Sequence, residues 1–295
     1  MNSRTIGRIA GPLLFGAVLI APPPGGMTQA PWIVAGLVVW MATWWMTQAI
    51  PLTATALLPF LVLPFAGIMS AGETASAYYS PTLFLILGGA FLALAIERTG
   101  LHRRLALALL DRLGSGGGAQ RLLLAFMIAA ALLSIAISNT STTLIMMPMA
   151  VAVLEAGGMQ SEDTRGLSGA LPMGIAFAAS IGGLGTLVGS PTNAIAVGLL
   201  DSMIGVKISF ATWSLIGVPA VVLGIPMAAW IIARVQGAST GTFRIGAARR
   251  AIAVEPRWSS AERRLLPLVA LAFTLWMTSP LLRPYLPAGA LTDGT

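Results

Sequence analysis

The sequence has 295 residues, of which 56% are hydrophobic and only 9% are charged, a balance that a soluble domain of this size does not show. Its formal net charge of +7 would suggest a nucleic-acid partner in a soluble protein. Here the basic residues cluster in loops between apolar runs. We therefore expect membrane lipid, and not nucleic acid, as the partner of this chain. The absence of cysteine excludes disulfides and thiol chemistry. The composition therefore predicts an all-α, multi-spanning integral membrane protein.

Apolar runs predict the membrane segments in chain order. Arg4 and Arg8 precede the first run without a small-residue cleavage pattern, so residues 1–30 are expected to hold a retained span and a loop. Residues 31–121 hold scaffold spans and an interfacial helix at 101–113, where Leu and Ala alternate with charged residues at helical spacing. The predicted segments are 9–21, 31–49, 53–68, 81–97, 122–137, 144–155, 167–188, 191–200, 209–233 and 265–283.

The basic residues predict the orientation of these segments. With a cytoplasmic N-terminus, only Lys207 and Arg283 of the 17 basic residues fall on the outer side. This positive-inside pattern predicts that loops 98–121 and 234–264 are cytoplasmic and that loop 200–208 is external.

A polar run interrupts the apolar sequence in the middle of the chain. Six hydroxyl or amide side chains, Ser138–Thr143, separate two apolar pieces. The longer piece would measure about 24 Å as a helix, less than a hydrocarbon core of about 30 Å. Arg121 and Arg165 flank the pair, and both must be cytoplasmic. We therefore predict a re-entrant helical hairpin over 122–155 with its tip at Ser138-Asn139-Thr140, facing protein or a wet cavity.

A second break falls in the stretch 167–200, which is again too long for one plain span. Gly189-Ser190-Pro191 interrupts it, and Pro191 suits the first position of a new helix. Each break ends a helix with free carbonyls, which suit a small cation, and starts a helix with free N–H groups, which suit an anion. The alternative is structural, because Ser and Thr are common in spans and Gly-x-Pro often only kinks a helix.

Three stretches resemble the divalent anion/sodium symporter family. They are "WWMTQAIPLTATALLPFLVLP" (44–64), "ISNTSTTLIMMP" (137–148) and "GSPTNAIAVG" (189–198), and the resemblance covers about residues 31–235. It implies a secondary active transporter, not an enzyme, that imports small divalent anions (di- or tricarboxylate, or sulfate) coupled to sodium. It also implies elevator-type alternating access in the full-length protein and no cofactor besides the sodium ion.

The resemblance also implies site residues. Sodium is expected at Ser134, Ser138, Asn139 and the backbone of Gly189. The substrate is expected at Ser138, Asn139, Thr140, Ser190 and Pro191. Gln48 departs from the family pattern, where an acidic residue is expected.

Members of this family contain two inverted repeats. This chain is expected to hold one inverted-repeat half, with a transport-type region at 122–235 that includes the hairpin, the broken helix and the span 209–233. A cytoplasmic linker at 236–264 and the first span of an incomplete second repeat at 265–295 would follow, so we expect a truncated chain. The family further implies the plasma (inner) membrane, and a homodimer when full length.

Charge arithmetic favours a coupling cation. One helix N-terminus stabilises an anion by up to about 2 kcal/mol, whereas one charge at mid-membrane costs at least about 2.5–3.5 kcal/mol. A small dianionic solute therefore needs cations, and all ten Asp and Glu residues fall in loops or at span ends, which favours sodium on neutral oxygens.

Other readings of the function stay open. They are a non-transporting membrane fragment or partner subunit, and a transporter of a related anion family. An intramembrane enzyme is disfavoured, because His102 is the only histidine and no catalytic acid falls within a span.

Overall fold

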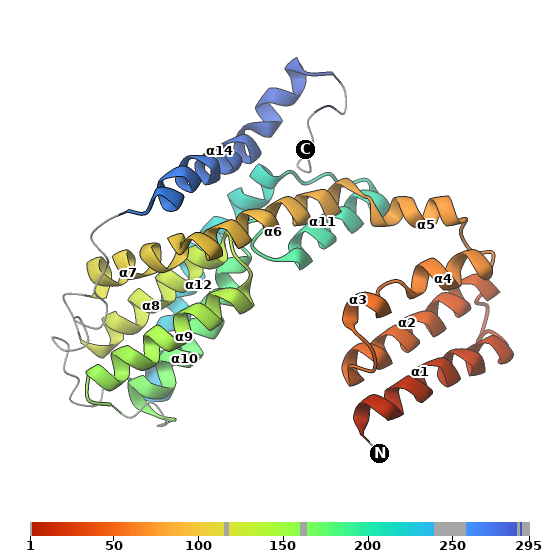
Figure 1. Ribbon diagram of the computed structural model, residues 1–295, viewed down its shortest axis with the longest axis horizontal. Helices are drawn as coiled ribbons and strands as arrows, with labels where there is room; N and C mark the ends of the chain where they lie inside the picture. The colour runs from red at the N-terminus through yellow and green to blue at the C-terminus, as the bar shows by residue number, and fades with distance from the viewer. Residues whose placement is uncertain (1, 115–117, 160–163, 239–257, 288–289, 291–295) are drawn as a thin grey trace. The chain divides into compact units, whose positions relative to one another are not determined.

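The computed structural model describes residues 2–114, 118–159, 164–238, 258–287 and 290. Every regular element in these residues is helical (Figure 1). Six helical stretches in this part of the chain are long and apolar enough to cross a membrane: Ser3–Ile20, Gln29–Thr47, Ala71–Thr99, Gly166–Gly183, Phe210–Gln236 and Ser260–Tyr285. The predicted class, an all-α multi-spanning membrane protein, is confirmed. Most of the predicted 236–264 linker lies outside the described residues.

The chain divides into two compact units, residues 1–80 and 81–295. The domain boundaries predicted at residues 30, 121, 235 and 264 remain predictions. The first unit contains α1 (Ser3–Ile20), α2 (Gln29–Thr47), α3 (Leu52–Thr55), α4 (Leu58–Phe65) and α5 (Ala71–Tyr78).

In the first unit, α1 packs along α2 (Figure 1). Glycines on α1 allow this close approach: a Cβ added at Gly11 would lie 2.5 Å from a ring carbon of Trp40. Arg8 donates a 2.7 Å hydrogen bond from Nε to the carbonyl oxygen of Ala49, just beyond α2. The α1–α2 pair is thereby fixed at the end where the chain enters α3.

The segment predicted as one span at 53–68 is instead divided into α3 and α4. Pro59 explains the division, because a proline has no N–H for the carbonyl four residues earlier and its ring clashes with that carbonyl. In this segment that carbonyl belongs to Thr55, the last residue of α3. The helix therefore ends there and restarts at Leu58.

The second unit contains the remaining elements, of which α8 lies at the centre. Ten of the 16 residues of α8 are buried, and α8 packs against α7, α9, α10 and α12. A Cβ on Gly182 of α10 would collide with the backbone of Ala131, so the α8 and α10 backbones are in contact. The elements are α6 (Pro81–Thr99), α7 (Leu101–Gly114), α8 (Ala119–Ser134), α9 (Asn139–Ala156), α10 (Gly166–Gly183), α11 (Pro191–Ile204), α12 (Phe210–Gln236), α14 (Ser260–Leu282) and the short 3-10 helix η1 (Arg283–Tyr285).

An ion pair joins α7, the predicted interfacial helix, to the start of α14. Arg104 Nε lies 2.8 Å from Glu262 Oε1, and both side chains are largely buried. The Arg104 guanidinium also lies over the ring of Trp258, 5.0 Å from its centroid. Glu262 forms a capping box with Ser259 at the same helix end. These contacts hold the start of α14 against α7.

Candidate functional site

The first break in the second unit lies between α8 and α9. Helix α8 ends at Ser134 and α9 begins at Asn139. Ser138 is the N-cap of α9, because its Oγ accepts a 3.2 Å hydrogen bond from the Ser141 backbone N–H. The predicted non-helical tip at Ser138-Asn139-Thr140 is therefore correct only at Ser138. The polar run that follows forms the first turns of a helix.

The second break lies between α10 and α11. Helix α10 ends at Gly183 and α11 begins at Pro191, the predicted first helical position. The irregular segment starts at Leu184, ahead of the predicted break at Gly189. Trp213 of α12 donates a 2.8 Å hydrogen bond from Nε1 to the Leu184 carbonyl oxygen, so a neighbouring helix satisfies an acceptor in this segment.

Thr186 connects the two breaks. Its hydroxyl donates a 2.6 Å hydrogen bond to the Ile135 carbonyl oxygen in the first break. The same oxygen accepts a 3.1 Å hydrogen bond from the Gly189 N–H in the second. Asn193, in the first turn of α11, donates from Nδ2 to the carbonyl oxygens of Gly183 at 2.7 Å and Thr186 at 2.8 Å. Thr186 and Asn193 are each only 4% exposed, so the junction is buried.

Carbonyl groups from both helix ends converge beside Gly189. A Cβ added to Gly189 would lie 2.7 Å from the Gly183 carbonyl oxygen and 2.8 Å from the Ser134 carbonyl oxygen. Gly183 ends α10 and Ser134 ends α8. The lack of a side chain at Gly189 therefore allows two helix C-termini, each with a partial negative charge, to approach the same point.

Asn139 contributes a further oxygen to this region. Its Oδ1 accepts a 2.7 Å hydrogen bond from the Ser134 hydroxyl. A Cβ added to Gly183 would collide with this Oδ1, so the amide of the hairpin lies directly against the end of α10. Ser134, Asn139 and Gly189, three of the four residues predicted to bind sodium, are thus brought together around Gly183. Hydroxyl, amide and carbonyl oxygens are the neutral donors that suit a small cation.

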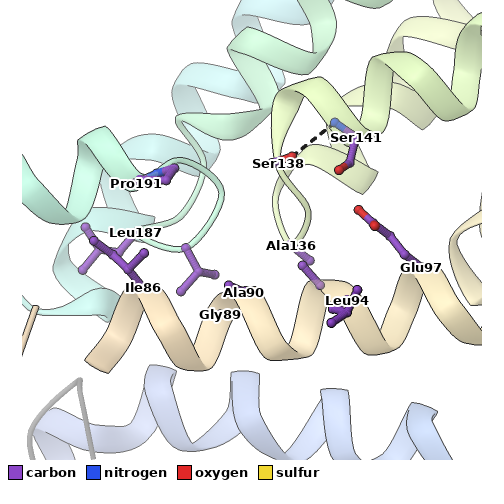
Figure 2. Close-up of a pocket in the computed structure, with 12 residues that line it drawn as sticks. Ile86, Gly89, Ala90, Leu94, Glu97, Ala136, Ser138, Ser141, Leu187 and Pro191 are labelled. Carbon is purple, nitrogen blue, oxygen red and sulfur yellow. Dashed lines mark hydrogen bonds between the residues drawn. The ribbon is translucent and has the colours of Figure 1, made fainter. Parts of the chain in front are cut away.

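Ser138, the fourth, lines a cavity of about 360 Å³ between α6 and the two breaks (Figure 2). Ser141 and Pro191 also line this cavity, which we call the hairpin cavity. Figure 2 shows Glu97 of α6 pointing toward the side on which Ser138 and Ser141 lie. The cavity thus combines the first turns of α9 and α11 with one carboxylate.

Three predicted substrate residues are absent from the described lining of the hairpin cavity, and the first of them, Asn139, lies against Gly183. Thr140 is exposed and is not among the described residues that line the hairpin cavity. Ser190 is likewise absent from that lining, and its Oγ lies 2.8 Å from the Thr192 hydroxyl.

Four residues of this region were not predicted as site residues from the sequence: Thr186, Asn193, Ser141 and Glu97. Thr186 and Asn193 flank the predicted break. Their closeness in sequence to Gly189 and Pro191 is the feature from which a role in the site could have been predicted. Nothing in the local sequence indicates that Glu97, at the end of a span, faces the hairpin.

Interrupted helices whose ends gather neutral oxygens are the arrangement found at the ion and substrate sites of broken-helix transporters. The chain belongs to the citrate transporter family (CitMHS), whose model matches residues 42–292. The predicted relationship to the divalent anion/sodium symporters is thereby confirmed.

The chain is also similar to curated proteins named sodium-dependent dicarboxylate transporter SdcS. The protein from Staphylococcus saprophyticus is 37% identical over 301 residues, which cover 98% of this chain and 57% of that relative. The protein from Staphylococcus aureus strain USA300 is 39% identical over 224 residues, which cover 74% of this chain and 43% of that relative. The chain therefore spans about half the length of the curated relatives that it matches.

Proposed function

We propose that this chain supplies one half of the binding site of a sodium-coupled importer of small dicarboxylates. The observation that carries the proposal is the convergence of the two breaks on Gly189, with the Ser134 and Gly183 carbonyl oxygens beside it. The names of the SdcS relatives, which mention sodium and dicarboxylates, support the same chemistry. In this proposal the protein acts in the plasma membrane with a cytoplasmic N-terminus, as an elevator-type homodimer when full length.

The proposed sodium ligands are Ser134, Ser138, Asn139 and the backbone of Gly189. Support comes from the hydrogen bond between Ser134 and Asn139 and from the partial negative charge of two helix C-termini at Gly189. A cation there would interact favourably with the partial negative charge of both helix ends.

The proposed anion ligands are Ser138, Asn139, Thr140, Ser190 and Pro191. Helices α9 and α11 both begin at the breaks, and the N–H groups of a first helical turn stabilise an anion. Two such helix ends contribute at most about 4 kcal/mol, less than the roughly 5–7 kcal/mol cost of placing two charges at mid-membrane. Sodium bound next to the anion would supply the difference, which is the physical reason for coupling.

Thiol modification tests this proposal on the cysteine-free chain itself. Ser141→Cys places one thiol in the hairpin cavity. It retains the backbone N–H that donates a hydrogen bond to Ser138 Oγ. In purified protein in lipid nanodiscs, succinate should slow methanethiosulfonate modification of this thiol in sodium but not in choline. Equal protection in both salts, or protection in neither, would refute sodium-coupled binding.

Uptake by reconstituted vesicles separates transport from binding alone. The vesicles receive an inward sodium gradient and labelled succinate, with empty vesicles as the control. Sodium-driven accumulation would support transport by this chain. Protection of the Ser141→Cys thiol without accumulation would instead support the partner-subunit alternative.

A further inference from the structure

A second cavity, of about 460 Å³, extends from Leu187 in the second break along α11 to the start of α12. It is lined by Thr82 at the start of α6, Asp201 near the end of α11, Lys207, Ser209 and Thr212 at the start of α12, and Arg283 after α14. We call it the Lys207 cavity. It contains none of the residues assigned above to sodium or substrate.

The charges of the Lys207 cavity are unusual for this protein. Lys207 and Arg283 are the two basic residues that the positive-inside pattern leaves on the outer side, and both line this one cavity. Asp201 is the one acidic residue among the described residues of its lining. The three side chains are exposed and bring a net charge of +1 to this concave surface, which favours an anion.

Polar donors accompany these cations. Ser209 is the N-cap of α12, a helix of 27 residues, and accepts a 3.1 Å hydrogen bond from the Thr212 N–H. The hydroxyls of Ser209 and Thr212 lie 2.9 Å apart on the cavity wall. The positive end of the α12 dipole therefore adds to the charges of Lys207 and Arg283.

An apolar barrier separates this cavity from the hairpin cavity. Leu187, in the second break, lines both cavities. It is 1% exposed and belongs to an apolar cluster with Leu85, Ala194 and Phe210. An anion in the Lys207 cavity would therefore be held apart from one in the hairpin cavity.

We propose that the Lys207 cavity is a second anion-binding site, which takes a ligand with carboxylate or phosphate oxygens. The proposal goes beyond the sodium-coupled function and does not depend on it. Two sources offer this chemistry, a small dicarboxylate in solution and the phosphate of a lipid headgroup. Lys207 and Arg283 supply the charge, the Ser209 hydroxyl supplies a directional donor, and Asp201 weakens binding.

A thiol in the Lys207 cavity tests the local charge. Thr212→Cys introduces a thiol at an exposed position. It retains the backbone N–H that donates a hydrogen bond to Ser209 Oγ. In phosphatidylcholine nanodiscs, an anionic methanethiosulfonate should react faster with this thiol than a cationic one. Adding Lys207→Gln should lower that preference about threefold or more, Asp201→Asn should raise it, and Lys207→Arg should preserve it. An uncharged reagent should react equally with all four proteins, which controls for structural damage.

Protection by anions tests occupancy. In phosphatidylcholine discs, succinate should slow modification of the Thr212→Cys thiol in choline as well as in sodium, unlike the sodium-dependent protection expected in the hairpin cavity. If the thiol reacts more slowly in phosphatidylglycerol discs than in phosphatidylcholine discs without succinate, and Lys207→Gln restores the faster rate, the ligand is a lipid headgroup. If neither succinate nor phosphatidylglycerol protects the thiol, whatever its reagent preference, the proposal is wrong. Failure of sodium-dependent protection at Ser141→Cys would leave this result unaffected, so the two proposals fail separately.

Discussion

The hydroxyl of Ser134, the last residue of α8, donates a 2.7 Å hydrogen bond to the amide oxygen of Asn139, the first residue of α9. This contact joins the two ends of the hairpin break through their side chains. The same amide oxygen also lies against Gly183, at the end of α10. One hydrogen bond therefore fixes an oxygen that contacts both breaks.

We expect Asn139→Ala to weaken sodium binding strongly. The substitution removes the amide oxygen beside Gly183 and leaves the Ser134 hydroxyl without this acceptor. The sodium concentration that gives half-maximal succinate protection of Ser141→Cys should rise about tenfold or more, which corresponds to about 1.4 kcal/mol. Thr140→Ala is the matched control, and it should raise the required succinate concentration while preserving the sodium dependence. Unchanged sodium dependence in Asn139→Ala would exclude this amide as a ligand.

Gly189→Ala should destabilise the protein and abolish sodium-dependent protection. Its Cβ would lie 2.7 and 2.8 Å from two carbonyl oxygens, so the helix ends must separate. Overpacking of this kind typically costs about 1–3 kcal/mol. Gly88→Ala on α6 is the control, because no described neighbouring atom lies within 4 Å of a Cβ built there. Thermal unfolding in detergent should show a lower midpoint only for Gly189→Ala; equal midpoints would show that the junction relaxes freely.

Thr186→Val should loosen the junction between the two breaks. Valine keeps the shape but leaves the buried Gly189 N–H and the Ile135 carbonyl oxygen without their hydroxyl partner. An unsatisfied buried group costs about 1–3 kcal/mol, so the unfolding midpoint should fall. Thr186→Ser retains the hydroxyl and should stay near the parent protein. A valine variant as stable as the serine variant would show that water replaces the hydroxyl.

Glu97→Gln should strengthen succinate binding in the hairpin cavity. A carboxylate in the lining repels a dianion, and neutralising it removes that repulsion. The succinate concentration for half-maximal protection of Ser141→Cys should fall about threefold or more in sodium. Glu155→Gln, at the other end of α9, changes the charge equally outside the cavity lining and should have little effect. Weaker binding in Glu97→Gln would mean that the carboxylate holds a cation.

Single cysteines test the predicted orientation of the second unit. Gln120→Cys and Thr164→Cys flank the hairpin and should label from the same side of the membrane, whereas Ser202→Cys on α11 should label from the opposite side. All three positions are exposed. A membrane-impermeant maleimide applied to oriented vesicles gives the readout. Labelling of Gln120→Cys and Thr164→Cys from opposite faces would contradict the re-entrant hairpin.

The sequence was informative about helix starts and less so about helix ends. Pro191 was placed correctly, because a proline at the first helical position has a local cause. The end of α10 was not, since Leu184 is apolar and its carbonyl is satisfied by Trp213 from a distant helix. Asn139 and Thr140 were assigned to the non-helical tip, although the serine before them is a capping signal for a helix that starts at Asn139.

The site residues divide in the same way. Ser134, Asn139 and Gly189 were identified through a family resemblance, and the structure brings them together. Thr186 donates to a backbone carbonyl of the other break, and Asn193 donates to carbonyls seven and ten residues earlier in its own break, so both contacts depend on the folded shape of the breaks. No periodicity or spacing in one sequence contains that information.

The ion pair between Arg104 and Glu262 also constrains the order of events during synthesis. The two residues are 158 positions apart in the chain. At about 5–20 residues per second, a ribosome that has placed Arg104 needs roughly 8–30 s more to deliver its carboxylate partner. The hairpin and the broken helix emerge within that interval and can pack around α8 first. Helix α14 can therefore dock onto a bundle that has already packed. A nascent chain that stalls before Glu262 would lack the Arg104–Glu262 ion pair although the junction between the two breaks has formed.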